Sequence, residues 1–432
     1  MNLAQLKALY AATGCTKLYA KKLAPNDNSK NQIYLGPDFH ALNLFPNRGV
    51  LPDSSAKNPI FKAKLNFGWL LADGRIAIAQ AAQFILYPQY PEVRFSGFLK
   101  GCTEPPSHLL ARRIDGRVLF LGVAPSGQVV GHVVSGDAIL AKELQDLCPL
   151  KDQGVFLELE LSDPSALSDP RAALLSELTR VHSLGWIDSK QLDGNGETRP
   201  CNAPQCGGFT LEAELKIPKN SSADPDFRGW EVKQHNVTSF ERVEVGTITL
   251  MTPEPSGGYY QDFGPEAFVR KFGYKDRLGR PDRLNFGGVH RVGQRHDLTK
   301  LTLTMIGYDN DRITDANGCL ALVSDRGEVA ASWHFVKMLE HWARKHSRAV
   351  YVPAQCRKNP KRQYAYGDRV RLAERTDALK LLHALSTGLV FYDPGIKVEH
   401  VSTNPAIKRR SQFRVSSRDI SSLYDSVELQ AL

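Results

Sequence analysis

Short apolar stretches rich in β-branched residues dominate the first part of the chain. They predict strands over residues 76–86, 93–99, 118–123, 129–134 and 155–161, separated by turn sequences such as Ala72-Asp73-Gly74 and Pro125-Ser126-Gly127. Strands at such hairpin-like intervals are typical of a small antiparallel barrel. We therefore predict a mainly β domain over residues 1–160.

The pattern changes near residue 165. Two Ser-Asp-Pro units, at 162–164 and 168–170, break any periodicity and predict a linker over residues 161–169. Apolar residues at helical spacing over 171–184 predict the first helix of a second domain, residues 170–432. This domain has an α/β (α+β) pattern, with predicted strands over 229–232, 246–250, 301–306 and 349–352 and predicted helices over 333–346 and 376–386.

Positive charge is concentrated near the C-terminus. The 432 residues carry 55 Lys and Arg against 46 Asp and Glu, a net charge of +9. Residues 343–432 alone hold 17 basic and 8 acidic side chains, so the whole excess lies in this segment. A local basic region suits a polyanion such as DNA, RNA or a membrane surface, and a solvated basic face is the alternative.

The seven cysteines are odd in number and scattered, which favours reduced thiols. Cys201 and Cys206 lack a second pair at ligand spacing, so no zinc site is predicted there. The spacing of His334, His341 and His346 places them on the surface of the helix predicted over 333–346. The chain has no apolar run of about 18 residues and no basic start followed by an apolar stretch, so we expect a cytoplasmic protein.

Candidate chemistry lies in the middle of the chain. Thr210 is predicted to cap a helix that carries Glu212, and residues 229–233 are predicted to form a strand. Alternation along this strand sends Glu231 and Lys233 to one face, and Asp226 just before it can point into the same space. The structural alternative is an exposed strand end with a surface ion pair.

Carboxylates beside one ammonium suit metal-assisted hydrolysis of a phosphodiester. Oxygen ligands favour Mg²⁺, which keeps several waters in its shell. We assign Asp226, Glu231 and the adjacent Val232 as metal ligands, Lys233 as the cation that positions water, and Glu212 as an accessory carboxylate.

An ordered set of motifs resembles the MvaI/BcnI family of restriction endonucleases, relatives of the nickase MutH. The set comprises GGFTLEAEL at 207–215, ADPDFRGWEVKQH at 223–235, TITLMTPEP at 247–255, NFGGVHR at 285–291 and AVYVPA at 349–354. The resemblance implies a PD-(D/E)xK nuclease core at Pro225, Asp226, Glu231 and Lys233, with Glu212 as its helix carboxylate. These positions coincide with those assigned from the residues themselves.

The resemblance also implies a monomer that reads a short, CG-rich, nearly palindromic site with late-chain arginines and a histidine. We carry that role to Arg410, Arg414 and His290, and we expect Lys408 and Arg409 to hold phosphate. Phosphate contact or solvated charge is the alternative for each.

The N-terminal region is similar to the effector-binding domain of EcoRII-type restriction enzymes, a DNA-binding pseudobarrel. The similarity rests on Tyr19-Ala20-Lys21-Lys22-Leu23-Ala24-Pro25-Asn26-Asp27-Asn28, although Asn28-Ser29-Lys30-Asn31 replaces the expected glycine-rich stretch. It implies that Lys22, Asn26 and Arg94 contact DNA.

The sequence thus predicts a Mg²⁺-dependent, site-specific endonuclease acting on double-stranded DNA, a type II restriction enzyme of phage defence with no membrane partner. A methylation-dependent endonuclease or repair nickase is one alternative. A non-catalytic DNA-binding protein is the other, although it would be expected to lose part of the Asp226, Glu231 and Lys233 set.

Overall fold

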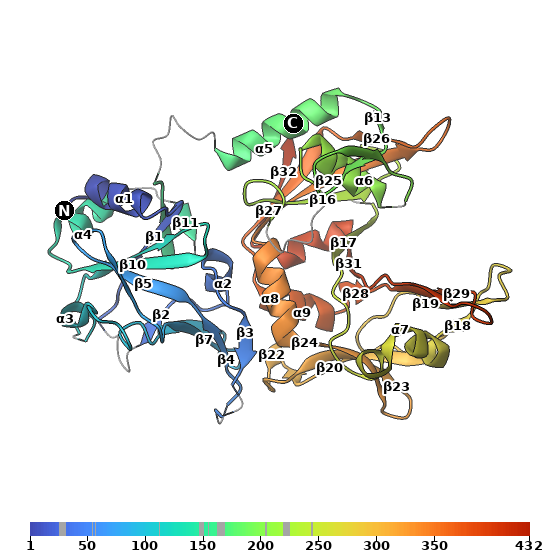
Figure 1. Cartoon of the computed structure of the whole chain (residues 1–432), viewed down its shortest axis with the longest axis horizontal. Helices are drawn as coiled ribbons and strands as arrows, with labels where there is room; N and C mark the ends of the chain where they lie inside the picture. Colours follow the sequence, from blue (N-terminus) through green and yellow to red (C-terminus); the bar gives the residue numbers. More distant parts are fainter. Residues whose placement is uncertain are drawn as a thin grey trace. The chain divides into compact units, whose positions relative to one another are not determined.

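The computed structural model describes residues 1–25, 32–53, 55–56, 58–111, 113–146, 151–153, 155–161, 169–203, 205–218, 225–242 and 245–432. The chain divides into two compact units, residues 1–168 with 312–316, and residues 169–311 with 317–432 (Figure 1). Of the predicted linker, only residues 161 and 169 belong to the described part. No helix in the described ranges is both long and apolar enough to span a membrane.

The N-terminal unit contains two β-sheets. The first has the strand order β11-β12-β1-β9-β10-β5-β6 and the second β2-β8-β7-β4-β3. Among the described strands of these two sheets, neighbours pair antiparallel except β5 and β10, which are parallel. The elements are α1 Leu3–Ala12, β1 Lys17–Lys22, β2 Gln32–Tyr34, α2 Ala41–Leu44, β3 Val50–Pro52, β4 Phe61–Lys64, β5 Asn66–Leu70, β6 Ile76–Ile78, β7 Gln83–Tyr87, β8 Glu92–Ser96, α3 Ser107–Leu110, β9 Val118–Val123, β10 Gln128–Val134, α4 Ile139–Asp146, β11 Lys151–Gln153 and β12 Phe156–Leu159.

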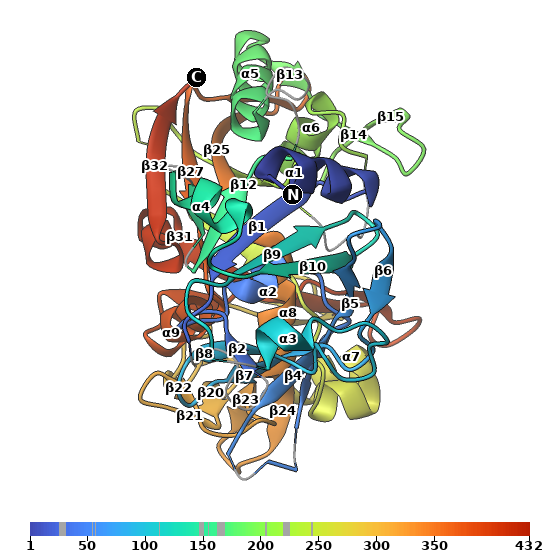
Figure 2. The same cartoon turned by 90° about the vertical axis from the view of Figure 1, so that its left-hand side faces the viewer.

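Two apolar layers hold this unit together. Helices α1 and α4 cover one face of the first sheet, where Leu6 and Leu140 pack with Leu18 and Phe120 (Figures 1 and 2). An aromatic cluster of Tyr19, Phe45, Phe67, Phe84, Phe95 and Phe156 joins strands of both sheets through edge-to-face contacts. The predicted strand over 76–86 is two strands, because residues 79–82 turn the chain from β6 to β7.

The second unit has a central sheet of order β13-β26-β25-β27-β32, in which β16 also pairs with β25, and smaller sheets β17-β31-β28, β18-β19-β29-β30 and β20-β23-β24. The elements are α5 Pro170–Ser183, β13 Ile187–Asp188, β14 Lys190–Leu192, β15 Thr198–Pro200, α6 Cys206–Glu214, β16 Glu231–Asn236, β17 Thr247–Met251, α7 Tyr259–Phe272, β18 Tyr274–Lys275, β19 Arg283–Gly287, β20 Leu301–Ile306, β21 Tyr308–Asp309, β23 Cys319–Ser324, β24 Val329–His334, α8 Phe335–Lys345, β25 Arg348–Arg357, β26 Gln363–Tyr366, β27 Arg369–Glu374, α9 Ala378–Ser386, β28 Val390–Tyr392, β29 Gly395–Glu399, β30 Ala406–Lys408, β31 Phe413–Ser416, the 3₁₀ helix η2 Ser417–Leu423 and β32 Ser426–Ala431. The short strand β22 Arg312–Ile313 belongs to the N-terminal unit.

The central sheet is buried on both faces. On one face, Leu174 and Leu178 of α5 and Leu211 of α6 pack on Val232 and Val350 of the sheet. The other face meets α8 and η2, and α5 and α8 lie on opposite sides of the sheet in Figure 1. Burial on both faces explains the nearly continuous apolar sequence of β25, whose residues 349–354 are all buried.

Three local predictions for this unit are wrong. Cys201 and Cys206 form a disulfide at the start of α6 and are not reduced thiols. Thr210 lies inside α6, where its hydroxyl bonds to the main chain of Lys190, because the helix already begins at Cys206. His346 is fully buried and its ring stacks on Trp342, since the end of α8 turns inward.

Candidate active site and adjoining groove

A two-residue turn brings the first two candidate carboxylates together. Phe227 and Trp230 exchange both main-chain hydrogen bonds, at 2.9 and 2.8 Å. Arg228 and Gly229 between them have φ values of 45° and 87°, the left-handed combination of a type I′ turn. The next pair outward, Asp226 and Glu231, therefore lies directly opposite across the hairpin, where side chains on one face are close.

From Trp230 into strand β16, successive side chains alternate between the buried core and the candidate site. Trp230 and Val232 are buried in the cluster under α5 and α6. Glu231 and Lys233 lie on the opposite face and form an ion pair. The main-chain N–H of Val232 donates to Asp226 Oδ2 at 3.0 Å, which fixes the Asp226 carboxylate beside the strand.

Glu231 is the most enclosed member of the group. Its side chain is 1% exposed, and its Oε1 atom meets Lys233 and, at 4.0 Å, the Nζ atom of Lys345 from α8. Its Oε2 atom is buried and has no hydrogen-bond partner within the described ranges. A buried carboxylate oxygen without a partner is costly, so this atom is available to a cation.

Electrostatics couple the four candidate side chains. Burial, together with the charge of Asp226, raises the pKa of Glu212 to about 7. Burial, together with the charge of Glu231, raises the pKa of Asp226 to about 6. Burial alone would lower the pKa of Lys233, but Glu231 and the other two carboxylates raise it. The raised pKa values show that the negative charges of Glu212 and Asp226 are disfavoured, so a further cation at the site would stabilise both carboxylates.

The donor set fits Mg²⁺ better than zinc. The described residues contain no group of three or more His, Cys, Asp or Glu side chains arranged around one point. Two carboxylates, those of Asp226 and Glu231, with the main-chain oxygen of Val232 nearby in sequence, form a sparse oxygen set. Such a set suits an ion that keeps waters and takes phosphate oxygens.

The sequence did not indicate the residues that pack behind the candidate carboxylates and Lys233. Tyr351 is the pairing partner of Lys233 in the parallel β16–β25 ladder, and its hydroxyl bonds to that of Tyr424 at 2.8 Å. Tyr424 in turn lies 3.3 Å from Nδ1 of the buried His346. Together with Lys345, these residues come from segments more than a hundred residues downstream, and no spacing signal links them to Lys233.

A basic groove of about 950 Å³ lies in the same unit. Lys408, Arg409 and Arg410 line it together with Arg277 and Lys397. The helix α6 that carries Glu212 reaches it through Gln205 at its first turn. The three predicted DNA-contacting residues at 408–410 are therefore brought together along one surface.

The other predicted DNA-contacting residues are placed differently. Arg414 is half-buried in β31 and bonds to Asp393. His290 is fully buried, its ring nitrogens bond to Gly288 O at 2.9 Å and Thr299 Oγ1 at 3.0 Å, and burial lowers its pKa to about 3. This enclosed position disagrees with base contact by His290, because the ring has no exposed edge.

In the N-terminal unit, Lys22 is exposed at the end of β1. Arg94 bonds to Glu92 at 2.9 Å and lies over the ring of Tyr87. Asn26 lies outside the described residues.

The sequence of the second unit is similar to that of a known protein family. The sequence model of the MvaI/BcnI restriction endonuclease family matches residues 175–424, more than half of the chain. The fold is thus that of a restriction endonuclease, with mixed α and β structure around the central sheet. The chain belongs to the MvaI/BcnI restriction endonuclease family.

Solved structures add two similar chains. Restriction endonuclease MvaI in complex with its cognate DNA substrate is 15% identical, with a TM-score of 0.47 over 61% of this chain and 99% of that chain. The same enzyme in the absence of DNA is 15% identical, with a TM-score of 0.34 over 61% of this chain and 98% of that chain. The curated proteins contain no match.

The raised pKa of Glu212 predicts a stability that falls as pH rises. The folded chain keeps the Glu212 proton up to about pH 7, whereas the unfolded chain loses it near the ordinary value of 4.5. Between these values the folded state binds more protons, so in metal-free buffer Glu212→Gln should raise the free energy of unfolding by about 1–3 kcal/mol at pH 8.

Urea unfolding of both proteins at pH 4 and pH 8, with chelator present, measures this effect. The two curves should converge at pH 4, where both states are protonated. Glu177→Gln, an exposed glutamate on α5, serves as the control. A constant difference between Glu212→Gln and the parent at both pH values would contradict the assignment.

Proposed function

We propose that the chain is a Mg²⁺-dependent type II restriction endonuclease that hydrolyses double-stranded DNA at a short, CG-rich, nearly palindromic site. Family membership supports site-specific DNA cleavage. The observation that carries the rest is the meeting of Asp226, Glu231 and Lys233 at the start of β16, where Lys233 pairs with Oε1 of Glu231 and the buried Oε2 atom has no partner in the described ranges. This arrangement supports the proposed PD-(D/E)xK core.

Each residue of the site has a separate proposed role at a bound phosphodiester. Asp226 and Glu231 would hold Mg²⁺, with the main-chain oxygen of Val232. When bound, the ion supplies charge to the phosphoryl oxygen and makes water more acidic. Lys233, held in place by Glu231, orients the attacking water and offsets charge on the phosphate. Glu212, with a pKa of about 7, is placed to exchange a proton near neutral pH.

The remaining parts of the proposal concern DNA binding. Lys408 and Arg409 hold phosphate, Arg410 and Arg414 read bases, and His290 positions the Gly288 loop from inside the fold. The N-terminal unit is proposed to be a pseudobarrel effector domain that binds DNA through Lys22, Asn26 and Arg94. One chain then engages DNA as a monomer with two modules, which raises the effective concentration of the second site.

Incubation of plasmid DNA with the full-length protein tests the function. Discrete fragments from unmethylated plasmid in Mg²⁺, and intact plasmid in EDTA, are expected, and sequencing of the fragment ends gives the site. Cleavage only of methylated plasmid would favour the methylation-dependent alternative. Nicked circles alone would favour a nickase, and a gel shift without cutting would favour a binding protein.

Arg410→Ala should weaken recognition of one base pair. Arg410 is exposed and lines the groove, where its guanidinium lies beside the Gln412 amide and within reach of a guanine edge of bound DNA. We expect a loss of about 1–3 kcal/mol at the cognate site, together with relaxed preference at one position. Cleavage of a library of single-base site variants measures both effects.

The control for Arg410 is Arg326→Ala, an exposed arginine in the turn between β23 and β24 and outside the groove. It should leave the cleavage pattern unchanged. A loss of equal size on every library member would assign Arg410 to phosphate contact and overturn base reading.

A further inference from the structure

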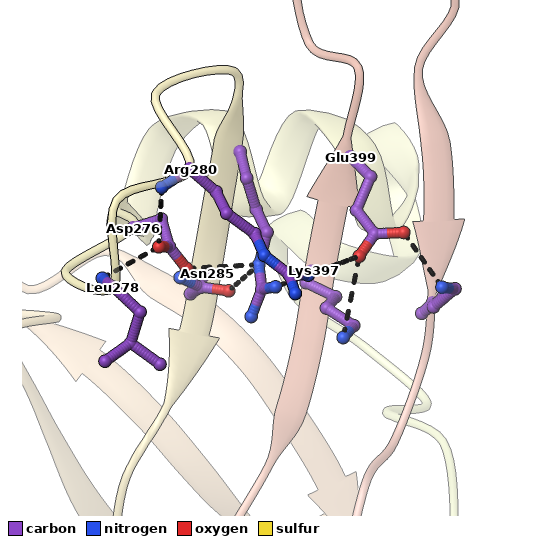
Figure 3. A network of polar contacts seen from close by, with 8 residues as sticks. Asp276, Leu278, Arg280, Asn285, Lys397 and Glu399 are labelled. Carbon is purple, nitrogen blue, oxygen red and sulfur yellow. Dashed lines mark hydrogen bonds and ion pairs between the residues drawn. The ribbon is translucent and has the colours of Figure 1, made fainter.

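The loop that joins β18 and β19 presents one apolar side chain to solvent. Leu278, which is labelled in this loop in Figure 3, has a side chain that points away from the strands. It is 87% exposed, more than any other large hydrophobic residue in the described ranges. A single exposed leucine is ordinary on a protein surface. This one differs in how firmly it is held and in what surrounds it.

Asp276 fixes the loop from within. Its carboxylate accepts the main-chain N–H of Leu278 at 2.8 Å and that of Arg280 at 3.2 Å (Figure 3). It also accepts from Asn285 Nδ2 at 2.9 Å, and its side chain is only 2% exposed. The main-chain N–H of Asp276 donates to Arg283 O at 3.1 Å, which closes the loop at its base.

The sequence of the tip adds stiffness. Gly279 has a φ of 82°, a left-handed conformation that other residues adopt only with strain. Pro281 follows two residues later and fixes its own φ. The loop therefore holds the Leu278 side chain outward.

The surroundings of Leu278 are strongly basic. Leu278 lines the same groove as Arg277, Lys397 and the 408–410 segment. Across the sheet, Glu399 lies 3.6 Å from Lys397 Nζ and 2.8 Å from Lys408 Nζ (Figure 3). Arg280 lies 3.9 Å from Glu399, and its side chain is 65% exposed. Glu399 therefore positions Arg280, Lys397 and Lys408, and the net charge of this cluster is positive.

An apolar tip between cations fits one feature of double-stranded DNA. Phosphates line the outside of the duplex, and the stacked bases are its only extended apolar surface. Proteins that deform DNA insert leucine or a similar residue between base pairs while cations hold the adjacent backbone. A rigid loop favours insertion, because the loop loses little conformational entropy when it binds DNA.

We propose that Leu278 inserts between adjacent base pairs of the DNA bound in the groove, while Arg277 and Arg280 hold the backbone on either side. The inference rests on the proposed function, because it requires that the groove binds duplex DNA. It makes Leu278 a specificity-determining residue, since base steps differ in how readily they unstack.

Fluorescence of 2-aminopurine tests the insertion. A short duplex carries the site found by end sequencing, with the probe placed at each position in turn, and Ca²⁺ replaces Mg²⁺ so that the DNA stays intact. The full-length protein should raise the fluorescence strongly at one base step. Leu278→Ala should remove this rise and weaken binding about tenfold, whereas Leu278→Met should keep both near the parent value.

Leu429→Ala is the matched control, since Leu429 is an exposed leucine of β32 outside the groove. It should change neither readout. A parent protein that binds and cuts the duplex without any fluorescence rise overturns the insertion, and so does a Leu278→Ala variant that retains the rise. A parent that neither binds nor cuts DNA rejects the proposed function itself, and the insertion with it.

Discussion

Lys233→Ala should lower the rate of DNA cleavage by about 10³-fold or more, equivalent to about 4 kcal/mol of transition-state stabilisation. Lys233 is the only one of the four candidate side chains with positive charge, and its ammonium is fixed on Glu231. DNA binding should stay within a few-fold of the parent, because the groove cations at 408–410 are untouched. Single-turnover cleavage and a gel shift in Ca²⁺ measure the two effects separately.

Lys233→Ala should also destabilise the folded protein, and this effect must be separated from the loss of catalysis. Removing one partner of a buried ion pair leaves the other charge unpaired, which costs about 3–5 kcal/mol when no other group compensates. Glu231 is 1% exposed, and Lys345 at 4.0 Å is its remaining cation. We therefore expect Lys233→Ala to be less stable than the parent.

A double variant distinguishes the two causes. Lys233→Met with Glu231→Gln replaces both charges with neutral groups of similar volume, so stability should recover while cleavage does not. Lys361→Ala, an exposed lysine paired with Asp188, is the surface control and should cut normally. Because Glu231 is itself a proposed metal ligand, recovery of cleavage together with stability in the double variant would show that neither charge of this pair takes part in the chemistry.

The sequence predicted the local parts of the site because they depend on neighbouring residues. The alternation of Glu231 and Val232 follows from the strand period, and the structure places these two on opposite faces. The Arg228-Gly229 pair marks a tight turn, and that turn sets Asp226 against Glu231. The strand itself begins at Glu231, two residues later than predicted, because Gly229 belongs to the turn.

Long-range pairing could not be predicted in the same way. Strand β16 lies parallel to β25, with Lys233 opposite Tyr351, although more than a hundred residues separate them. Nothing in a single sequence encodes that register. The burial of His346 follows from this pairing, because α8 must cover the face that carries Glu231.

His290 shows a second limit. Its residue type suits base contact, but burial and internal partners decide whether a side chain is free to reach DNA. The His290 ring is enclosed between Phe286 and His296. By contrast, Leu278 carries no polar group and attracts no notice in the sequence, yet its loop makes it the most exposed large apolar side chain described.

Asp226→Asn should abolish cleavage in Mg²⁺ and remove the thermal stabilisation that Mg²⁺ gives the parent protein. The asparagine side-chain oxygen still accepts the N–H of Val232, so the turn is retained. The negative charge is lost, and with it one of two carboxylates proposed to hold the ion. We expect a fall of about 10³-fold or more in rate.

Stability should change in opposite directions with and without metal. Without Mg²⁺ the variant should be at least as stable as the parent near pH 8, because Asp226 and Glu231 no longer repel each other and the pKa of Asp226, raised to about 6, shows that its charge is disfavoured there. In the parent, Mg²⁺ at about 100 times its dissociation constant adds about 2.7 kcal/mol, whereas the variant gains little. Thermal melts over a Mg²⁺ titration measure this difference without any turnover, with Asp325→Asn, a surface carboxylate paired with Arg295, as the control. If Asp226→Asn melts at the parent temperature at every Mg²⁺ concentration and cuts at the parent rate, the ion is held elsewhere, since no other change in the site would compensate for a lost ligand.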